Sequence, residues 1–410
     1  MVDVAVISIG DELINGFTID TNSAWIARNI SKYNLLDVED KIILKDDSNK
    51  IKSSIDFLLK KQYRFIFITG GLGPTHDDIT KNTLKDYFDC DMVLNEEHFS
   101  TLKVRYAAHI PLNLESIKNQ SKILSISKAI PNDKGTALGM LIKHKKTDIF
   151  IIPGVPREME CMFTQYIAPL YIDPYYDKKN KYITILTTGI YETKLYSILK
   201  SIIDINRDRF KVSFLPDYTG VKVRISALDE TGPLSFFRDE IVSKIKKYVY
   251  GYDDDTLEYI VAKTLIDSGL TLAIAESCTG GYLSKKMTDV PNSSKYFIGS
   301  VVAYSNQIKI KYLGVPESLL KTKGAVSREV ALAMAENVRN KFNVDIGIST
   351  TGISGPSGGS IKNPIGRIYI AIVTKNDKVV KKFDLIPDRN YHRKIAVHVA
   401  LNMLRLLLKI

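Results

Sequence analysis

The sequence is poor in cysteine, tryptophan and histidine, and it has no long hydrophobic run. The three cysteines, Cys90, Cys161 and Cys278, are far apart and odd in number. This argues against a disulfide framework, and their spacing is not that of metal ligands. No stretch of ~18 uncharged apolar residues could span a membrane. Residues 2–9 read as a strand rather than a signal peptide. We therefore expect a cytoplasmic protein without a membrane partner.

Positive charge is in excess, but it is spread along the chain. The net charge is +11 over 410 residues. Short lysine clusters at residues 244–247 and 378–382 are typical of solvated faces. Such a positive charge favours anionic partners, and these can be nucleotides and other phosphorylated metabolites as well as nucleic acid. The length, with 45% hydrophobic residues, indicates two or three globular domains.

The first segment alternates predicted strands with predicted helices. Residues 4–9, 64–69 and 148–152 are buried-strand runs, whereas residues 22–32 and 48–59 have helical periodicity. This alternation predicts a parallel sheet with right-handed crossovers, whose ligands bind at the carboxyl ends of the strands. The glycine-rich turns after the strands should therefore gather at one edge.

These turns carry both glycines and carboxylates. The glycine backbone could hold a phosphate while the carboxylates hold a hard divalent cation. A helix N-cap is the alternative role for Asp20 and Asp77. The predicted nucleotide and phosphate site consists of Gly10, Asp11, Gly70, Gly71, Gly73 and Thr75, and the nearby carboxylates are Glu12, Asp20, Asp46, Asp47, Asp77 and Asp78.

The same turns resemble the molybdopterin-binding-like domain of the CinA family. The motifs are Gly-Asp-Glu-Leu-Ile-Asn-Gly at residues 10–16, Asp-Thr-Asn at 20–22, the run from Thr69 to Asp78, and residues 152–159. The resemblance implies that Asp46 and Asp78 are working aspartates, and Asp46, Asp77 and Asp78 become the candidate metal ligands. Leu138 stands where the family usually has proline.

A turn-rich stretch at residues 169–182 suggests a domain boundary. The family has a small KH-like domain directly after this place. An RNA-binding KH fold needs a Gly-x-x-Gly loop, but Gly189, Gly220 and Gly232 are isolated. We therefore expect a connector or dimerisation element, and we do not expect nucleic-acid binding.

The central motif of the last segment is Glu-Ser-Cys-Thr-Gly-Gly at residues 276–281, which lies between an apolar strand-like run and a helix-like run. Ser277 there could be a nucleophile or an N-cap. Its base could be Lys309, if burial lowers the lysine pKa; read alone, Lys309 is typical of a surface lysine. Cys278 is the rival nucleophile and Glu276 the rival base. His392 and His398 both lie in the final helix.

Four blocks of this segment resemble the CinA C-terminal amidohydrolase, the nicotinamide mononucleotide deamidase of the family. They are residues 275–281, 304–306 with Lys309, 324–327 and 351–359. The resemblance implies a Ser277–Lys309 dyad, assisted by Tyr304, that needs no cofactor. Asn363 stands where the family tends to have lysine, with Lys362 one position earlier. The predicted substrate-binding residues are Thr279, Gly280, Gly281, Thr351, Gly352, Gly355 and Arg389.

Together these patterns predict an α/β protein with two αβα domains of mostly parallel sheets, joined by a small α+β, KH-like connector. The predicted domains are residues 1–170, 171–252 and 253–410. The expected reaction converts nicotinamide mononucleotide to nicotinate mononucleotide and ammonia in pyridine nucleotide recycling. The alternatives are a metal-dependent ADP-ribose pyrophosphatase in the N-terminal domain, or a non-catalytic nucleotide- or pterin-binding regulator linked to competence. The family also suggests a homodimer.

Overall fold

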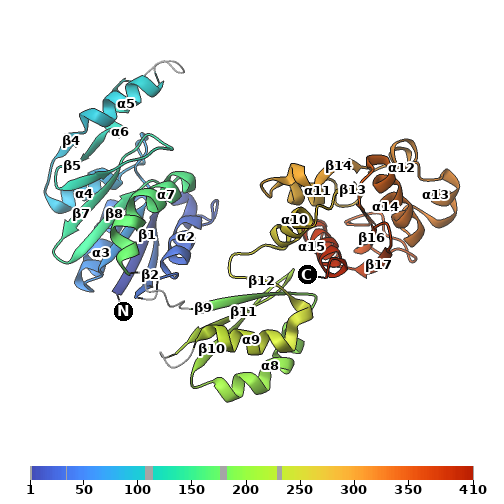
Figure 1. Ribbon diagram of the computed structural model, residues 1–410. Helices are drawn as coiled ribbons and strands as arrows, with labels where there is room; N and C mark the ends of the chain where they lie inside the picture. Colours follow the sequence, from blue (N-terminus) through green and yellow to red (C-terminus); the bar gives the residue numbers. More distant parts are fainter. Residues whose placement is uncertain (1, 34, 107–113, 176–181, 229–232, 410) are drawn as a thin grey trace. The chain divides into compact units, whose positions relative to one another are not determined.

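The computed structural model describes residues 2–33, 35–106, 114–175, 182–228 and 233–409 (Figure 1). The chain divides into two compact units, Met1–Lys181 and Tyr182–Ile410. The boundary expected after residue 170 falls inside the π-helix η1 (Phe163–Ile172). Part of the turn-rich stretch and Gly232 lie outside the described residues. No helix in the described part of the chain is long and apolar enough to cross a membrane.

The first unit is built on a mixed sheet. Its strand order is β2 (Leu36–Leu44), β1 (Val2–Ile9), β3 (Phe65–Thr69), β8 (Thr147–Ile152), β7 (Gly139–His144) and β6 (Ser127–Ile130). The pairs from β2 to β8 are parallel, as the alternation of strands and helices predicts. The pairs β8–β7 and β7–β6 are antiparallel and were not anticipated. Three of these parallel strands, β1, β3 and β8, end in the glycine-rich turns.

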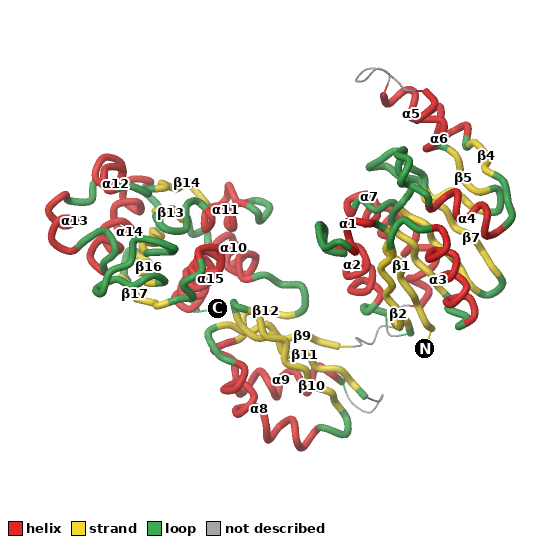
Figure 2. The backbone as a smooth tube through the Cα atoms, turned by 180° about the vertical axis from the view of Figure 1, so that it is seen from behind, coloured by secondary structure: helices red, strands yellow, loops and turns green. Residues whose placement is uncertain are grey.

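Helices cover both faces of this sheet (Figure 2). The helices are α1 (Asp11–Ile14), α2 (Thr21–Ile30), α3 (Ser48–Lys60), α4 (Thr80–Phe88) and α7 (Pro156–Met162). Because successive strand residues point to opposite faces, Ile7 packs with Ile55 of α3 on one side. Val6 packs with Ile26 of α2 and Met159 of α7 on the other. The remaining elements are β4 (Met92–Leu94), α5 (Glu96–Tyr106), α6 (Leu114–Gln120), β5 (Lys122–Leu124) and the 3-10 turn η2 (Asp173–Tyr175).

The second unit begins with an antiparallel sheet in the order β10 (Phe210–Asp217), β11 (Gly220–Ala227), β9 (Tyr182–Thr188) and β12 (Val249–Tyr252). Helices α8 (Glu192–Asn206) and α9 (Leu234–Ile245) and the turn η3 (Lys246–Tyr248) complete this part. Leu199 and Phe237 of the two helices share a core with Ile185 of β9. This is the α+β arrangement expected for the connector.

The second unit continues with a mixed sheet in the order β14 (Phe297–Val302), β13 (Leu272–Glu276), β15 (Ile346–Gly352), β16 (Arg367–Val373) and β17 (Lys378–Asp384). The pairs β14–β13 and β13–β15 are parallel, whereas β16 and β17 are antiparallel to their neighbours. A mostly parallel sheet was therefore the wrong expectation, because the short turn at residues 374–377 can join only antiparallel strands. The lysine cluster at 378–382 forms the edge strand, where charge discourages further pairing.

Helices again lie on both faces of this sheet. They are α10 (Leu257–Asp267), α11 (Tyr282–Thr288), α12 (Asn306–Leu313), α13 (Glu317–Lys323), α14 (Arg328–Phe342) and α15 (Arg389–Leu407), with the turn η4 (Ser293–Lys295). Ile274 of β13 packs with α10, α11 and α15, and Ala275 with α12 to α14. Arg405 of α15 joins this sheet to the connector, because its guanidinium donates to the carbonyls of Lys247 and Val249. The end of β13 thus lies between two well-packed layers.

Candidate active site

The turn that carries Ser277 joins β13 directly to α11. The residue at the N-cap position of α11 is Gly281 with φ of 90°, which has no side chain of its own to cap the helix. Gly280 also has a positive φ of 58°, a conformation that favours glycine. The N-cap role considered for Ser277 is therefore wrong. The hydroxyl of Ser277 is left available for chemistry in a residue that is only 8% exposed.

Glu276 does the capping that Ser277 does not. Its carboxylate accepts hydrogen bonds from the N–H groups of Gly281 (2.9 Å), Leu283 (3.1 Å) and Ser284 (2.8 Å) and from the Ser284 hydroxyl (2.5 Å). An acidic group at a helix N-terminus is favoured by the helix dipole as well. Because four donors occupy this fully buried carboxylate, Glu276 shapes the turn and is not free to act as the base.

Lys309 is buried beside Ser277, so its interpretation as a surface lysine is wrong. It lies in the first turn of α12, which Ser305 caps by accepting from the N–H of Ile308. Only 1% of Lys309 is exposed. Its Nζ lies 3.1 Å from Ser277 Oγ, and it donates to the carbonyls of Ala303 (2.7 Å) and Tyr304 (3.3 Å). Burial lowers the pKa of Lys309 from 10.5 to about 8.

The three partners of Lys309 match the needs of a neutral amine. A neutral lysine has two N–H donors and one lone pair. If the carbonyls of Ala303 and Tyr304 take the two donors, the lone pair faces the hydroxyl of Ser277. A pKa near 8 keeps a substantial neutral fraction at neutral pH, as a general base requires. The arrangement can therefore remove a proton from Ser277.

Cys278, the rival nucleophile, is turned into the core. It is 7% exposed and belongs to the hydrophobic cluster around β13. Burial raises the pKa of its thiol to about 12, which disfavours the reactive thiolate. Among the described residues, the backbone N–H groups of Cys278 and Thr279 have no backbone oxygen as acceptor, and both lie within hydrogen-bonding reach of the Cys278 sulfur. They are the candidate donors for an oxyanion that forms next to Ser277.

The structure brings two further predicted residues, Gly355 and Tyr304, together at Arg389. Its Nη1 donates to the carbonyl of Gly355 (3.1 Å) and its Nη2 to the hydroxyl of Tyr304 (3.2 Å). Tyr304 is 59% exposed, so its hydroxyl lies toward solvent. The 351–359 turn, Tyr304 and the start of α15 therefore meet beside the Ser277 turn.

Two predicted substrate-binding threonines have structural partners instead. Thr279 Oγ1 and Thr350 Oγ1 lie 2.7 Å apart in the interior, and Thr351 Oγ1 donates to the carbonyl of Ala325 (2.7 Å). Gly352 follows Thr351 at the end of β15. These side chains tie the turns to one another. The groups of this region that remain available to a substrate are backbone groups and side chains with free polar atoms.

Arg393 was not anticipated from the sequence. Its Nε and Nη2 donate to the carbonyl of Thr279 at 3.2 and 2.8 Å, so it holds the Ser277 turn from α15. The spacing of four residues from Arg389 was the available signal, because such residues share a helix face. Asn363 donates to the carbonyl of Val326 (3.0 Å). Asn363, which departs from the family pattern, thus links the segment after residues 351–359 to the turn at residues 324–327.

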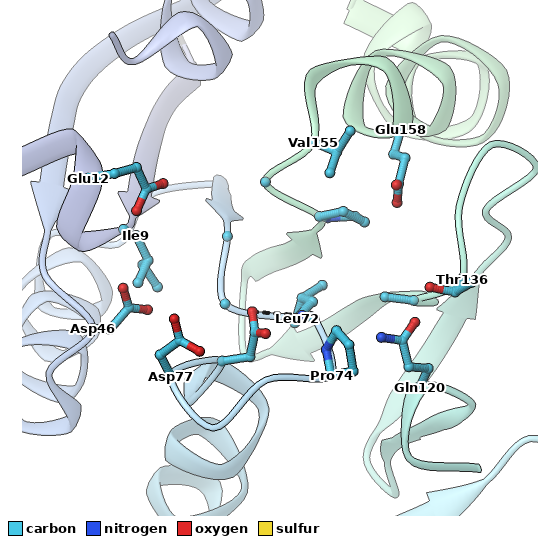
Figure 3. Close-up of a pocket in the computed structure, with 18 of the residues that line it drawn as sticks. Ile9, Glu12, Asp46, Leu72, Pro74, Asp77, Gln120, Thr136, Val155 and Glu158 are labelled. Carbon is cyan, nitrogen blue, oxygen red and sulfur yellow. Dashed lines mark hydrogen bonds between the residues drawn. The ribbon is translucent and has the colours of Figure 1, made fainter. Parts of the chain in front are cut away.

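The first unit carries a separate pocket of about 530 Å³ at the carboxyl ends of its strands (Figure 3). The three glycine-rich turns do gather there, with Gly10, Gly70, Gly71, Gly73 and Gly154 in the lining. A Cβ at Gly70 would lie 2.2 Å from the carbonyl oxygen of Ile9, and the φ of Gly70 is 108°. The close approach of β1 and β3 therefore requires glycine at this position.

The predicted metal ligands do not form one set. Asp78 accepts hydrogen bonds from the N–H groups of Gly73 (2.8 Å) and Thr75 (2.9 Å) and from the Thr75 hydroxyl (2.5 Å). Its carboxylate therefore holds its own loop together. Within the described residues, no three His, Cys, Asp or Glu side chains cluster as metal ligands. Asp46 and Asp77 do face the pocket (Figure 3). Asp78 thus serves as the acceptor of three hydrogen bonds within its loop.

Burial raises the pKa of Asp46, and the neighbouring carboxylates of Asp11, Glu12 and Asp77 raise it further. The N–H of Asp11 opposes this effect, since it donates to Asp46 Oδ2 (3.1 Å), and the N–H of Asp46 donates back to Asp11 Oδ1 (3.2 Å). Asp20 accepts from the N–H of Ser23 (3.0 Å), so its N-cap role holds. The pocket therefore has an acidic end at Asp46.

Two lining residues, Gln120 and Thr136, escaped the sequence analysis. They lie across the pocket with Glu158, and Glu12 lies at the acidic end (Figure 3). Glu158 is oriented by Asn132, which donates to its Oε2 (2.7 Å). Gln120 and Thr136 come from α6 and a loop, and they belong to none of the motif turns. Leu138, the departure from the family pattern, is 3% exposed and packs in the core.

Two family models match this chain. The model described as "Probable molybdopterin binding domain" matches residues 5–172, and "CinA C-terminal domain" matches residues 254–408. A CinA-like protein of Amoebophilus asiaticus is 36% identical over 414 residues, which cover 98% of each chain. A putative competence-damage inducible protein of Caldicellulosiruptor saccharolyticus is 35% identical over 406 residues, again 98% of each.

Among solved structures, a competence/damage-inducible protein from Agrobacterium tumefaciens matches with 32% identity, over 38% of this chain and 98% of that chain, at a TM-score of 0.36. A score of this size does not establish a shared overall fold. Family membership rests on the full-length relatives and on the two family models, which together take in both units. On that basis, the chain is a member of the CinA family, with a molybdopterin-binding-type domain in its first unit and a CinA C-terminal domain in its second.

Proposed function

We propose that the C-terminal domain is an amidohydrolase that converts nicotinamide mononucleotide to nicotinate mononucleotide and ammonia. The observation that carries the proposal is the buried amine of Lys309, 3.1 Å from Ser277 Oγ, with two carbonyls to hold its protons. The choice of substrate comes from the resemblance to the family deamidase, since no residue pattern in the site is specific for nicotinamide.

In the first half-reaction, neutral Lys309 removes the proton of Ser277 as its oxygen attacks the carboxamide carbon. The N–H groups of Cys278 and Thr279 donate to the oxyanion, and such donors contribute about 3 kcal/mol each in other hydrolases. Lys309 then gives its proton to the leaving nitrogen, and the C–N bond breaks. Ammonia departs, and an ester joins the nicotinoyl group to Ser277.

In the second half-reaction, water replaces ammonia. Lys309 takes a proton from the water as the hydroxide adds to the ester carbon, and it returns that proton to Ser277 Oγ as the C–O bond breaks. The product leaves as the carboxylic acid and releases its proton to solvent to become the carboxylate, and the dyad is restored. Atoms and charge balance over the two steps, and the 5′-phosphate has a partner of opposite charge in Arg389, beside the glycine-rich 351–359 turn.

The test is ammonia release from nicotinamide mononucleotide by the full-length protein with EDTA present, alongside Ser277→Ala and Cys278→Ala. We expect turnover in the parent and in the cysteine variant, and a loss of at least ~10³-fold in the serine variant. Loss in the cysteine variant alone would make Cys278 the nucleophile. Absence of ammonia from the parent protein would overturn the proposed substrate.

A second activity is favoured by the pocket of the first unit. We propose that it binds ADP-ribose and hydrolyses its pyrophosphate. The residues offer a divalent cation the oxygen ligands it prefers, because the carboxylates of Asp46 and Asp77 both line this pocket. Asp46 and Asp77 would hold the cation, which would polarise the pyrophosphate as a Lewis acid. Release of AMP that needs added Mg²⁺ and is lost in Asp46→Asn tests this. Binding without hydrolysis would favour a regulatory role.

A further inference from the structure

A smaller cavity of about 80 Å³ opens beside the pocket of the first unit. Ile9, Glu12, Gly154 and Pro156 line both spaces, and Figure 3 shows Ile9 and Glu12 on the acidic side of the larger pocket. The cavity has several times the ~10–15 Å³ that one buried water needs. It therefore adjoins the larger pocket and has room for a small group of a bound molecule.

Two polar atoms without a partner belong to residues that line this cavity. Ser8, which is 1% exposed, and Asn22, which is 7% exposed, both line it. Neither Ser8 Oγ nor Asn22 Oδ1 has a hydrogen-bond partner among the residues that the structure describes. A buried polar atom without a partner costs roughly 1–3 kcal/mol, so each such atom calls for an explanation.

Several of the neighbouring polar groups are already paired with one another or with the backbone. Asn22 Nδ2 donates to Thr69 Oγ1 (2.9 Å) and to the carbonyl of Gly154 (2.8 Å). Thr69 Oγ1 donates to the carbonyl of Pro153 (3.0 Å), and the Asp20 carboxylate accepts from the N–H and hydroxyl of Ser23. This network holds the Asn22 side chain in place, with its free oxygen as a preset acceptor.

The two free atoms define the chemistry of their occupant. Asn22 Oδ1 can only accept, so the occupant must donate a hydrogen bond, whereas the Ser8 hydroxyl can donate one to it. A phosphate oxygen cannot donate, and the nearby Glu12 and Asp20 carboxylates disfavour an anion. A hydroxyl group that both donates and accepts fits both atoms.

We propose that this cavity, defined by Ser8 and Asn22, is the subsite for a ribose hydroxyl of the nucleotide whose phosphates occupy the larger pocket. The inference rests on the proposed nucleotide binding in the first unit. It adds that Ser8 donates to the sugar and Asn22 accepts from it. The subsite distinguishes a ligand that carries this ribose hydroxyl from one that lacks it.

The experiment uses the full-length protein and isothermal titration calorimetry with ADP-ribose, ADP and 2′-deoxy-ADP. For Ser8→Ala we expect affinity for ADP-ribose to fall about tenfold, the size typical of one lost hydrogen bond. The same substitution should not lower the melting temperature without ligand, because it removes an unpaired buried hydroxyl. The matched control is Thr147→Val. Thr147 Oγ1 donates to the carbonyl of Tyr63 (2.6 Å) at the far end of β8, so this variant should lose stability and keep its affinity.

A thermodynamic cycle identifies the sugar as the contact. If the terminal ribose meets Ser8, the effect of Ser8→Ala should vanish for both ADP and 2′-deoxy-ADP. If the 2′-hydroxyl of the adenosine ribose meets Ser8, the effect should vanish for 2′-deoxy-ADP alone. An equal loss of affinity for all three ligands, or no loss for any, overturns the subsite and leaves the cavity as a water site. Failure of the parent protein to bind ADP-ribose at all would instead overturn the proposed second activity.

Discussion

The two sites of this chain differ in how their polar groups are satisfied. Around Ser277, the carboxylate of Glu276 has four donors and the amine of Lys309 has three partners. In the first unit, the acidic end has mutually repelling carboxylates, and Ser8 and Asn22 have oxygens without a partner in the described part of the chain. The first arrangement is organised before any substrate arrives, as an active site for chemistry should be. The second has groups that are left for a ligand, a cation or water to satisfy.

The largest expected effect comes from removing the amine in the organised site. Lys309→Met should lower kcat for ammonia release by about 10³-fold, because a general base typically contributes 10²–10⁴. It should also raise the melting temperature at pH 7, since a buried amine with a depressed pKa opposes folding. Lys311→Met, on the exposed side of the same helix, is the control for both assays. A small effect on kcat would refute the role of the dyad.

The pH profile should separate the two sites next. Burial lowers the pKa of Lys309 to about 8, and the base works only when neutral, so activity falls as pH drops. We expect kcat/KM for ammonia release to decrease about tenfold per unit below pH 8, or about 100-fold by pH 6, and to level off above pH 8. A flat profile from pH 6 to 9, or a midpoint near 10.5, would contradict this assignment.

A smaller effect should result from loosening the turn. Glu276→Gln replaces a buried acceptor of four hydrogen bonds with an amide that can accept only part of them. We expect the free energy of unfolding of the second unit to fall by about 2–4 kcal/mol, measured with urea. Glu317→Gln on α13, where the side chain is exposed, should change it little. Equal stability of the two variants would mean that the caps of α11 contribute nothing.

The smallest effect concerns the support from α15. Arg393→Lys retains the charge but loses the paired donation to the carbonyl of Thr279. We expect kcat to fall about tenfold or less with KM nearly unchanged, as for one charge-assisted hydrogen bond. Arg339→Lys on α14, which also donates to a backbone carbonyl, is the matched control. A change in KM alone would instead place Arg393 against the substrate.

The strand ends and the glycine turns after them could be predicted from the residues alone. Residues 4–9, 64–69 and 148–152 lie in strands whose carboxyl ends match the predicted ones, and their glycine turns meet at one pocket. These features are local, because apolar periodicity and glycine conformation depend on neighbouring residues. The antiparallel strands β7 and β17 were missed, since their lysines and short turns masked the pattern.

The roles of the side chains within the sites, in contrast, depend on folding. Lys309 lies 32 residues from Ser277 in sequence, and its low pKa exists only because α12 buries it against the end of β13. That Glu276 rather than Ser277 caps α11, and that the Asp78 carboxylate is used by its own loop, depends in the same way on folded geometry. Burial and hydrogen-bond pairing are properties of segments brought together by folding, so no local pattern encodes them.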